Sequence, residues 1–400
     1  MPNPVRSLEL VEEIPRSFHK GELSVETAQA IYRSGKVEVE ARPFDPEHPF
    51  ILTSKGIVGH VPIGKDLVVR IAPKTSISNL FRMLEVAYDL KSFKLLEGMV
   101  SIEQLEDLFD RLASILANRI LSRTRKGVFR DYVTENRDLA CIRGRLRLRE
   151  TARGLMRGSP RVHCEFQEHT ADLEDNRVLL WTLWLLSGIA LTRAEVRARI
   201  RAAYRALSHG VSLVQISPAA CVNRRYHRLN EDYQALHGIC RFFLEHAGPG
   251  SKQGEHTMIP FIVNMPQLFE RFIALWLQGN VEDHYQVQIQ HVAALEATEK
   301  LSFKIDIVLQ DPKTGKAFAV MDTKYKLGEA PLESDVQQVV AYAVEMGVDR
   351  AFLVYPSVEG GNLRARVGHI VVEGLSFDLG ANYDEEGQRF RESLLRKMAA

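Results

Sequence analysis

Two aspartates interrupt the apolar pattern of residues 301–356, in places that suit a metal site. Asp306 stands between two isoleucines, and Asp322 stands between a methionine and a threonine. An ionised carboxylate among apolar neighbours is costly unless a positive charge compensates it. If the two residues lie on paired strands and converge, their oxygens provide a site for a hard divalent cation, Mg²⁺ or Mn²⁺.

Three further polar residues have the spacing to reach the same place. Lys324 follows Asp322 by two positions, so on a strand both side chains project from one face. A lysine there can hold a nucleophilic water or stabilise the charge that builds on a phosphorus oxygen. Gln338 and Tyr342 are four positions apart and share one face of a helix, which can look at the same site.

Strands and one helix are expected to position these residues. Apolar and polar residues alternate at the start of the stretch, as in a half-buried strand. Ser334 and Gln337 have the spacing of a capping box, and Gly347 is typical of a helix end. The expected elements are a strand over residues 301–309, a turn over 311–315, a strand over 317–326, a helix over 334–347 and a strand over 351–355.

This arrangement resembles the PD-(D/E)xK nuclease superfamily, through Asp306, the Asp322-Thr323-Lys324 triplet and the QxxxY pattern of Gln338 and Tyr342. Ile305 stands where the superfamily's name has proline, a residue that does no chemistry. On the aspartates and lysine alone, a surface hairpin with salt bridges is the alternative. The resemblance implies an acidic residue on a preceding helix. Glu270, in an amphipathic helix over residues 264–277, is the candidate, with a surface ion pair to a base such as Arg271 as the alternative.

Composition indicates an ordinary globular protein. The chain has 400 residues, which suggests two or three domains, with 45% hydrophobic and 26% charged residues and a net charge of +1. Its four cysteines form no CxxC pair, which argues against a zinc knuckle and fits a reducing cytoplasm. The first residues hold no apolar signal core, and no stretch approaches a membrane span, so we expect a cytoplasmic protein without membrane association.

Three regions are predicted along the chain. Residues 1–100 read as a β-rich domain of short strands, a small barrel or sandwich, which either docks a partner or is purely structural. Residues 101–250 read as mainly helical, basic and DNA-contacting, and residues 251–400 as the PD-(D/E)xK nuclease domain. The expected fold class is therefore α+β or α/β and multidomain: a β-rich N-terminal domain, a helical basic middle region and a C-terminal restriction-endonuclease-like core.

The middle region carries the main charge asymmetry. Residues 119–161 hold 13 Lys and Arg against 4 Asp and Glu. Arginine-rich faces suit phosphate backbones, because each neutralised phosphate releases counterions. A solvated face paired with neighbouring acids is the alternative. In a strand, one face would be lined by four alternating arginines, the predicted DNA-binding residues: Arg143, Arg145, Arg147 and Arg149.

Across most of its length the chain is similar to the McrC family, the nuclease subunits of McrBC-type restriction systems. The resemblance rests on GIVGHVPIGKDLVVRIAPKTSISNLFRMLEVAYDL, DLACIRGRLRLRE, HCEFQEHTADLEDNRVLL, LFERF, DTKYK and QQVVAYA. It implies a Mg²⁺-dependent endodeoxyribonuclease for modified double-stranded DNA of the 5-methylcytosine type. It also implies an AAA+ GTPase partner of McrB type, whose GTPase the N-terminal domain stimulates. This chain has no GxxxxGK[ST] loop, so nucleotide hydrolysis would come from that partner. A stand-alone nuclease of repair or defence, and a catalytically silent activator of a motor, are the rival classes.

Overall fold

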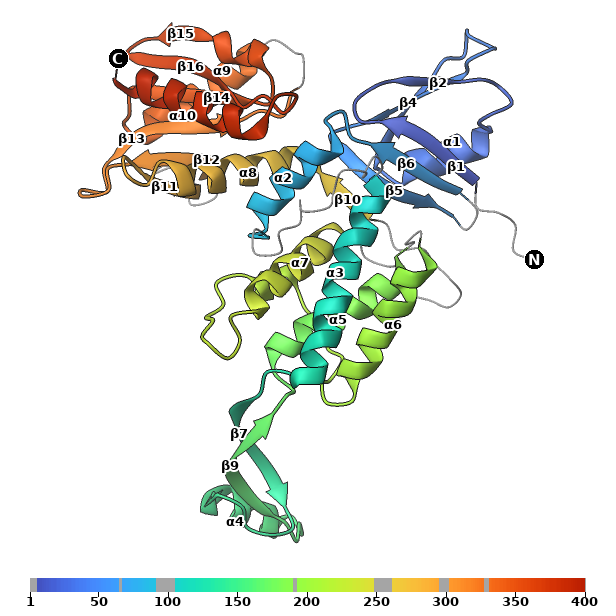
Figure 1. The fold of residues 1–400 in the computed structure, drawn as a ribbon, viewed down its shortest axis with the longest axis vertical. Coiled ribbons are helices and arrows are strands. Elements are labelled where there is room, and N and C mark those ends of the chain that lie inside the picture. Colours follow the sequence, from blue (N-terminus) through green and yellow to red (C-terminus); the bar gives the residue numbers. More distant parts are fainter. Residues whose placement is uncertain are drawn as a thin grey trace. The chain divides into compact units, whose positions relative to one another are not determined.

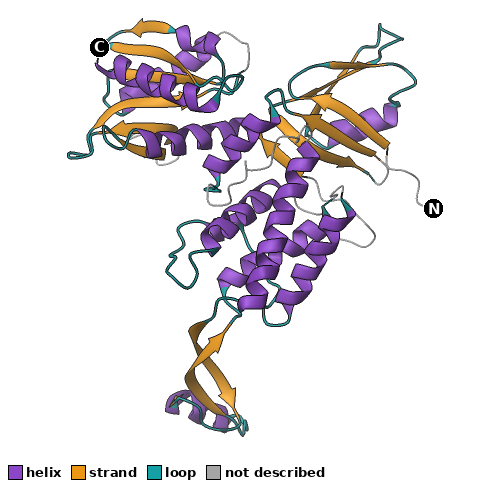
Figure 2. Cartoon of the chain, viewed as in Figure 1, coloured by secondary structure: helices purple, strands orange, loops and turns teal. Residues whose placement is uncertain are grey.

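The computed structural model describes residues 6–64, 67–90, 105–189, 193–247, 261–294, 302–326 and 331–399 (Figure 1). The chain divides into two compact units, of which one joins Met1–Leu108 with Gly248–Ala400 and the other is Phe109–Ala247. Both units contain helices and strands (Figure 2), which confirms a mixed α and β multidomain protein. In the described part of the chain, no helix has the length and apolar character that a membrane span requires.

The N-terminal part of the first unit consists of two sheets and two helices. One sheet has the strand order β1-β6-β5-β10 and the other has the order β2-β4-β3. The short strands expected here are thereby confirmed. The elements are β1 (Arg6–Val11), β2 (Arg16–Phe18), α1 (Val25–Arg33), β3 (Val37–Ala41), β4 (Phe50–Ser54), β5 (Ile57–Ile63), β6 (Leu67–Ala72), α2 (Ile77–Ala87) and β10 (Phe261–Asn264).

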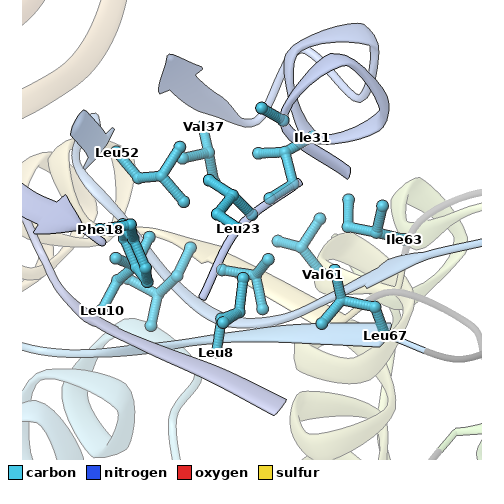
Figure 3. Packing of buried hydrophobic residues seen from close by; sticks show 13 residues of the cluster. Leu8, Leu10, Phe18, Leu23, Ile31, Val37, Leu52, Val61, Ile63 and Leu67 are labelled. Carbon is cyan, nitrogen blue, oxygen red and sulfur yellow. The ribbon is translucent and has the colours of Figure 1, made fainter. Parts of the chain in front are cut away.

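Alternating apolar side chains of these strands build one core (Figure 3). Leu8 and Leu10 of β1 are buried with alternate residues of β5 and β6, as the period of two on a strand requires. Phe18 and Leu52 from the second sheet, which are both fully buried, close the same cluster. This core holds the two N-terminal sheets together.

Strand β10 explains why residues distant in sequence form one unit. It pairs antiparallel with β5, with Phe261 opposite His60. Gly59 lies beneath this crossing with φ +125, and a Cβ there would lie 2.2 Å from the Phe261 carbonyl oxygen. Only glycine permits so close a backbone approach. The regions predicted as 1–100 and 251–400 are thus joined by a shared sheet.

The C-terminal part of the first unit is a mixed six-stranded sheet of order β11-β12-β13-β14-β16-β15. The pairs β13–β14 and β14–β16 are parallel and the other pairs antiparallel. Helix α9 connects the parallel strands β13 and β14, as a βαβ crossover does. The elements are α8 (Met265–Asn280), β11 (Gln286–Ala294), β12 (Ser302–Gln310), β13 (Ala317–Thr323), α9 (Glu333–Glu345), β14 (Arg350–Tyr355), η3 (Val358–Asn362), β15 (Arg364–Val367), β16 (Ile370–Ser376) and α10 (Tyr383–Ala399).

Helices cover this sheet through apolar contacts. Val339 and Ala343 of α9 are buried in a cluster with Val320 and Leu353 of the central strands. Helices α8 and α10 meet through aromatic rings, with Trp276 and Phe390 at 5.4 Å in an edge-to-face arrangement. The central strands are therefore mostly apolar, and the polar side chains that interrupt them, such as Asp306 and Asp322, stand out.

The start of α9 differs from the predicted capping box. Leu332 occupies the N-cap position, two residues earlier than the Ser334 and Gln337 pattern implied. Asp335 lies at the third helical position, and its carboxylate accepts a 3.3 Å hydrogen bond from the Leu332 backbone N–H. The acidic residue satisfies this helix start because a carboxylate is favoured near the positive end of the helix dipole.

The second unit combines helices with a three-stranded ribbon of order β7-β9-β8. The ribbon was not predicted, because β7 is polar and largely exposed. Helix α5 packs against α6 and α7. The elements are α3 (Leu105–Lys126), most of which belongs to this unit, β7 (Asp131–Leu139), β8 (Arg145–Leu146), α4 (Leu148–Met156), β9 (Val162–Thr170), α5 (Glu174–Gly188), α6 (Ala194–Ser208), η2 (Pro218–Cys221) and α7 (Tyr233–His246).

Candidate active site

The two predicted aspartates lie side by side on adjacent strands of the first unit. Ile307 of β12 pairs with Met321 of β13, so Asp306 and Asp322 occupy the next positions along the ladder. Asp306 is half-buried, and its Oδ2 accepts hydrogen bonds of 2.9 Å from both the backbone N–H and the hydroxyl of Thr323. Asp322 is only 3% exposed. The sheet register therefore brings two carboxylates from distant sequence positions together.

Burial and the neighbouring charge of Asp306 both raise the pKa of Asp322. The net pKa of Asp322 is about 6, with burial as the largest cause of the rise, the charge of Asp306 as the second and Lys324 opposing both. Glu270 of α8 has a pKa raised by burial first and by Asp306 second. Carboxyl groups whose pKa values are raised by burial and by a neighbouring negative charge are stabilised in their ionised form by a nearby cation.

Lys324 is the centre of the hydrogen-bond network. Its Nζ lies 2.7 Å from Oδ2 of Asp322 and donates a 2.7 Å hydrogen bond to Oε1 of Gln338. Gln338 in turn donates a 2.6 Å hydrogen bond to the hydroxyl of Tyr342, whose ring packs edge-to-face on Phe303. Lysine, glutamine and tyrosine thus form one chain of contacts from the strand to helix α9, as the shared helix face predicted.

Residues 322–326 also place a second lysine beside the site. Strand β13 ends at Thr323, earlier than the predicted end at Lys326. The Lys324 backbone N–H still donates a 2.8 Å hydrogen bond to the Val354 carbonyl of β14. Lys326 Nζ lies 2.6 Å from Asp335 Oδ2, and Lys324 Nζ lies 3.9 Å from Oδ1 of the same residue. Asp335 is therefore a fourth acid of this region.

The carboxylates suit a hard divalent cation by the chemistry of their donors. Asp306, Asp322 and Glu270 offer carboxylate oxygens, the donors that such ions prefer, from three separate elements, and the charge of Asp306 acts on both of the others. Within the described residues, no group of three or more His, Cys, Asp or Glu side chains stands in position to hold a metal ion. The ammonium of Lys324 occupies the position beside Asp322 that compensates its charge. The residues therefore fit such an ion in kind, as a carboxylate pair with Glu270 nearby.

A family model matches residues 52–356, more than half of the chain, and its description is McrBC 5-methylcytosine restriction system component. The chain belongs to the McrBC family. This confirms the family resemblance drawn from the sequence. The match begins within β4 and covers β5, β6, α2, the whole of the second unit and the strands that carry both aspartates.

Two relatives of this McrBC-family chain are informative. The Type IV methyl-directed restriction enzyme EcoKMcrBC of Escherichia coli K12 is 24% identical over 207 residues, which are 50% of this chain and 58% of that protein. A chain in a refined half-complex of the tetradecameric assembly of Thermococcus gammatolerans McrB AAA+ hexamers with bound McrC is 18% identical. It covers 98% of this chain and 100% of its own length with a TM-score of 0.58, and so shares the fold.

Gln290 was not predicted from the sequence, and its side chain contacts Glu270. Ile289 pairs with Ile307 and His291 with Ile305, which places Gln290 opposite Asp306. Its backbone has φ 50, in the left-handed region that non-glycine residues rarely adopt. Its side-chain amide donates a 3.0 Å hydrogen bond to Oε1 of Glu270. No pattern in the sequence marks such a conformation. The hydrogen bond of Glu270 is thus to Gln290, and the charge of Arg271 acts on the same carboxylate as a smaller influence that lowers its pKa.

The predicted arginine-lined strand in the second unit is wrong as a geometry. Only Arg145 lies in a strand, whereas Arg147 caps helix α4 and Arg149 lies within it. Gly144 has φ +69, and a Cβ there would lie 2.4 Å from the Glu165 carbonyl oxygen, so the chain turns where alternation was expected. Arg143 covers the ring of Phe166 at 4.2 Å, and Arg147 pairs with Glu165. Arg143, Arg145 and Arg149 are exposed and Arg147 is half-buried, and of the exposed three Arg145 and Arg149 do not cover an aromatic ring in this way.

Proposed function

We propose that this chain is the McrC-type nuclease component of a modification-dependent restriction complex and cleaves DNA phosphodiesters with Mg²⁺ or Mn²⁺. The observation that carries the proposal is the position of Lys324. Its Nζ lies 2.7 Å from Asp322 Oδ2 and 2.7 Å from Gln338 Oε1, next to the strand that carries Asp306. The mixed sheet with the crossover helix α9 supports the assignment of a PD-(D/E)xK core.

The chain's own residues would share the work as follows. Asp306 and Asp322 would hold the metal ion, with Glu270 as a further carboxylate. A bound divalent ion supplies a water of lowered pKa and compensates charge on the phosphate. Lys324 holds the attacking water or stabilises the charge that grows on the phosphorus oxygen. Gln338 fixes the ammonium of Lys324, and the hydroxyl of Tyr342 fixes Gln338.

Partner and substrate follow from the family and its solved assembly. The Thermococcus structure contains McrB AAA+ hexamers with bound McrC. This chain has no GxxxxGK[ST] loop, so in our proposal an McrB-type GTPase binds it and hydrolyses the nucleotide. The family description and the methyl-directed Escherichia coli relative support double-stranded DNA with 5-methylcytosine as the substrate. The exposed arginines of the second unit are the proposed backbone contacts.

The test is cleavage of 5-methylcytosine DNA by the full chain with its McrB-type partner, GTP and Mg²⁺. The Asp306→Asn variant keeps the size of the side chain and removes its charge, so we expect a loss on the order of 10²-fold or more in cleavage rate. GTP turnover by the partner is the control and stays at the wild-type value. Cleavage at the wild-type rate by Asp306→Asn, or wild-type cleavage without any divalent ion, contradicts the proposal.

A further inference from the structure

Glu12 is a buried carboxylate that the proposed chemistry does not use. It follows β1, where the two N-terminal sheets meet. Its backbone N–H donates a 2.8 Å hydrogen bond to the carbonyl of Ala72, the last residue of β6, and it forms a β-bridge with Ser54 of β4. The residue is 0% exposed. The next residue, Glu13, has φ 55, a left-handed conformation that is costly for a non-glycine residue. Several contacts thus hold this carboxylate in one place.

The side chain of Glu12 reaches the segment that carries Lys324. The Tyr325 hydroxyl donates a 3.2 Å hydrogen bond to Oε2 of Glu12, and the Lys74 backbone N–H lies 3.4 Å from the same oxygen. Oε1 of Glu12 accepts no hydrogen bond from any residue that the structure describes. Burial raises the pKa of Glu12 to about 7, and the charge of Glu13 adds to the shift. A buried acceptor this poor in partners depends strongly on the hydroxyl of Tyr325.

Tyr325 is in turn the side-chain anchor of the segment after β13. It is 6% exposed, and its ring contacts that of Phe269, the neighbour of Glu270, at 5.8 Å between centroids. The regular strand has ended at Thr323, so Lys324 keeps a single ladder hydrogen bond to Val354. One tyrosine therefore connects the N-terminal sheets, the helix that carries Glu270 and the backbone of Lys324.

We propose that Glu12 and Tyr325 are positioning residues for Lys324, so that the N-terminal sheets fix the geometry of the nuclease site. The inference rests on the proposed function of Lys324. A misplacement of about 1 Å at a reacting group lowers rates on the order of 10²-fold. Loss of the Tyr325 hydroxyl leaves its ring packed but frees the segment, which predicts a smaller loss of about 10-fold in kcat with KM for DNA unchanged.

The experiment compares Tyr325→Phe, Glu12→Leu and Glu12→Gln in the full chain with its McrB-type partner, Mg²⁺ and 5-methylcytosine DNA. Leucine removes the acceptor, so we expect about 10-fold lower kcat. Glutamine keeps an oxygen for the tyrosine hydroxyl and is expected to restore cleavage to within about 3-fold of wild type. Tyr383→Phe is the matched control, because it removes a half-buried hydroxyl of the same unit remote in sequence from Lys324.

Amide hydrogen exchange gives a readout that does not depend on cleavage. The Lys324 N–H donates a hydrogen bond to the Val354 carbonyl, and the Lys326 N–H donates one to the Lys324 carbonyl. Faster exchange of both amides is expected in Tyr325→Phe and Glu12→Leu but not in Tyr383→Phe. Unchanged exchange and unchanged kcat in these two variants, while Asp306→Asn is inactive, overturn the positioning role and leave the proposed function intact. A wild-type complex that does not cut overturns both.

Discussion

At the residue scale, the proposed chemistry depends on the small set of side chains that contact the ammonium of Lys324. Lys324 contacts Asp322 and Gln338 at 2.7 Å each, and Asp335 at 3.9 Å. The contact with Gln338 is a charge-assisted hydrogen bond and the contact with Asp322 is an ion pair, and partial burial keeps solvent from screening either. The sequence predicted Asp322, Lys324 and Gln338 because their types and spacing are local features. Asp335 and Gln290 were not predictable, because their roles depend on a helix start and on a strained strand conformation.

Glu12 leads to a prediction for the pH dependence of stability. Its pKa is raised from 4.5 to about 7 in the folded chain, so between these values the folded state binds more protons than the unfolded state. The stability from Glu12 is therefore fully present below pH 4.5 and is lost as pH rises through 7. The shift corresponds to at most about 3 kcal/mol.

Denaturant unfolding of wild type and Glu12→Gln at pH 4.5 and pH 8 measures this contribution. Glutamine does not titrate, so the wild-type free energy of unfolding should fall relative to that of Glu12→Gln as pH rises. Other titrating groups, including Lys74 and Glu13 beside it, are common to both chains and cancel in the comparison. Parallel stabilities of the two proteins across this range would show that Glu12 titrates near its ordinary value.

At the element scale, the period of the apolar residues decided what could be predicted. Strands β12 and β14 and helix α9 have buried faces, and the sequence placed each within a few residues of its observed bounds. The ribbon of β7 and β9 buries little along β7, so its alternation carries no apolar signal. The arginine pattern of residues 143–149 imitated a strand, but Gly144 turns the backbone there.

The exposed arginines of this ribbon region carry the prediction for DNA association. Arg145 and Arg149 form no ion pair among the described residues, whereas Arg147 pairs with Glu165. Reversal of both, Arg145→Glu with Arg149→Glu, should weaken binding to every DNA sequence. The slope of log K against log salt should fall by about 2, because each phosphate contact contributes about 0.9.

The matched control for this charge reversal is Arg33→Glu with Lys36→Glu, which changes the net charge equally on exposed residues near α1. Fluorescence anisotropy of the full chain with double-stranded DNA at several salt concentrations gives both affinities and slopes. If the control and the Arg145 and Arg149 variant lose affinity equally, the effect is one of net charge and the ribbon is only a solvated face.

At the scale of the whole molecule, the first unit is built from both ends of the chain. Strand β10 completes the N-terminal sheet beside β5, and helix α2 packs against α8. A division into separate domains at residues 100 and 251 stays a prediction, yet a deletion of residues 1–100 removes the sheet partner of β10 and the acceptor of Tyr325. Sequence patterns are local, so they did not reveal this return of the chain. Point variants therefore separate the proposed activities better than truncation does.

The most direct measurement of the central claim is the cleavage rate of Lys324→Ala in the complex with its McrB-type partner. The account predicts a loss on the order of 10²-fold or more, because the variant removes the group that stabilises the transition state. GTP turnover and DNA affinity should stay at wild-type values, and Lys313→Ala, an exposed lysine in the turn after β12, should cut as wild type does. Cleavage by Lys324→Ala at the wild-type rate would contradict the account.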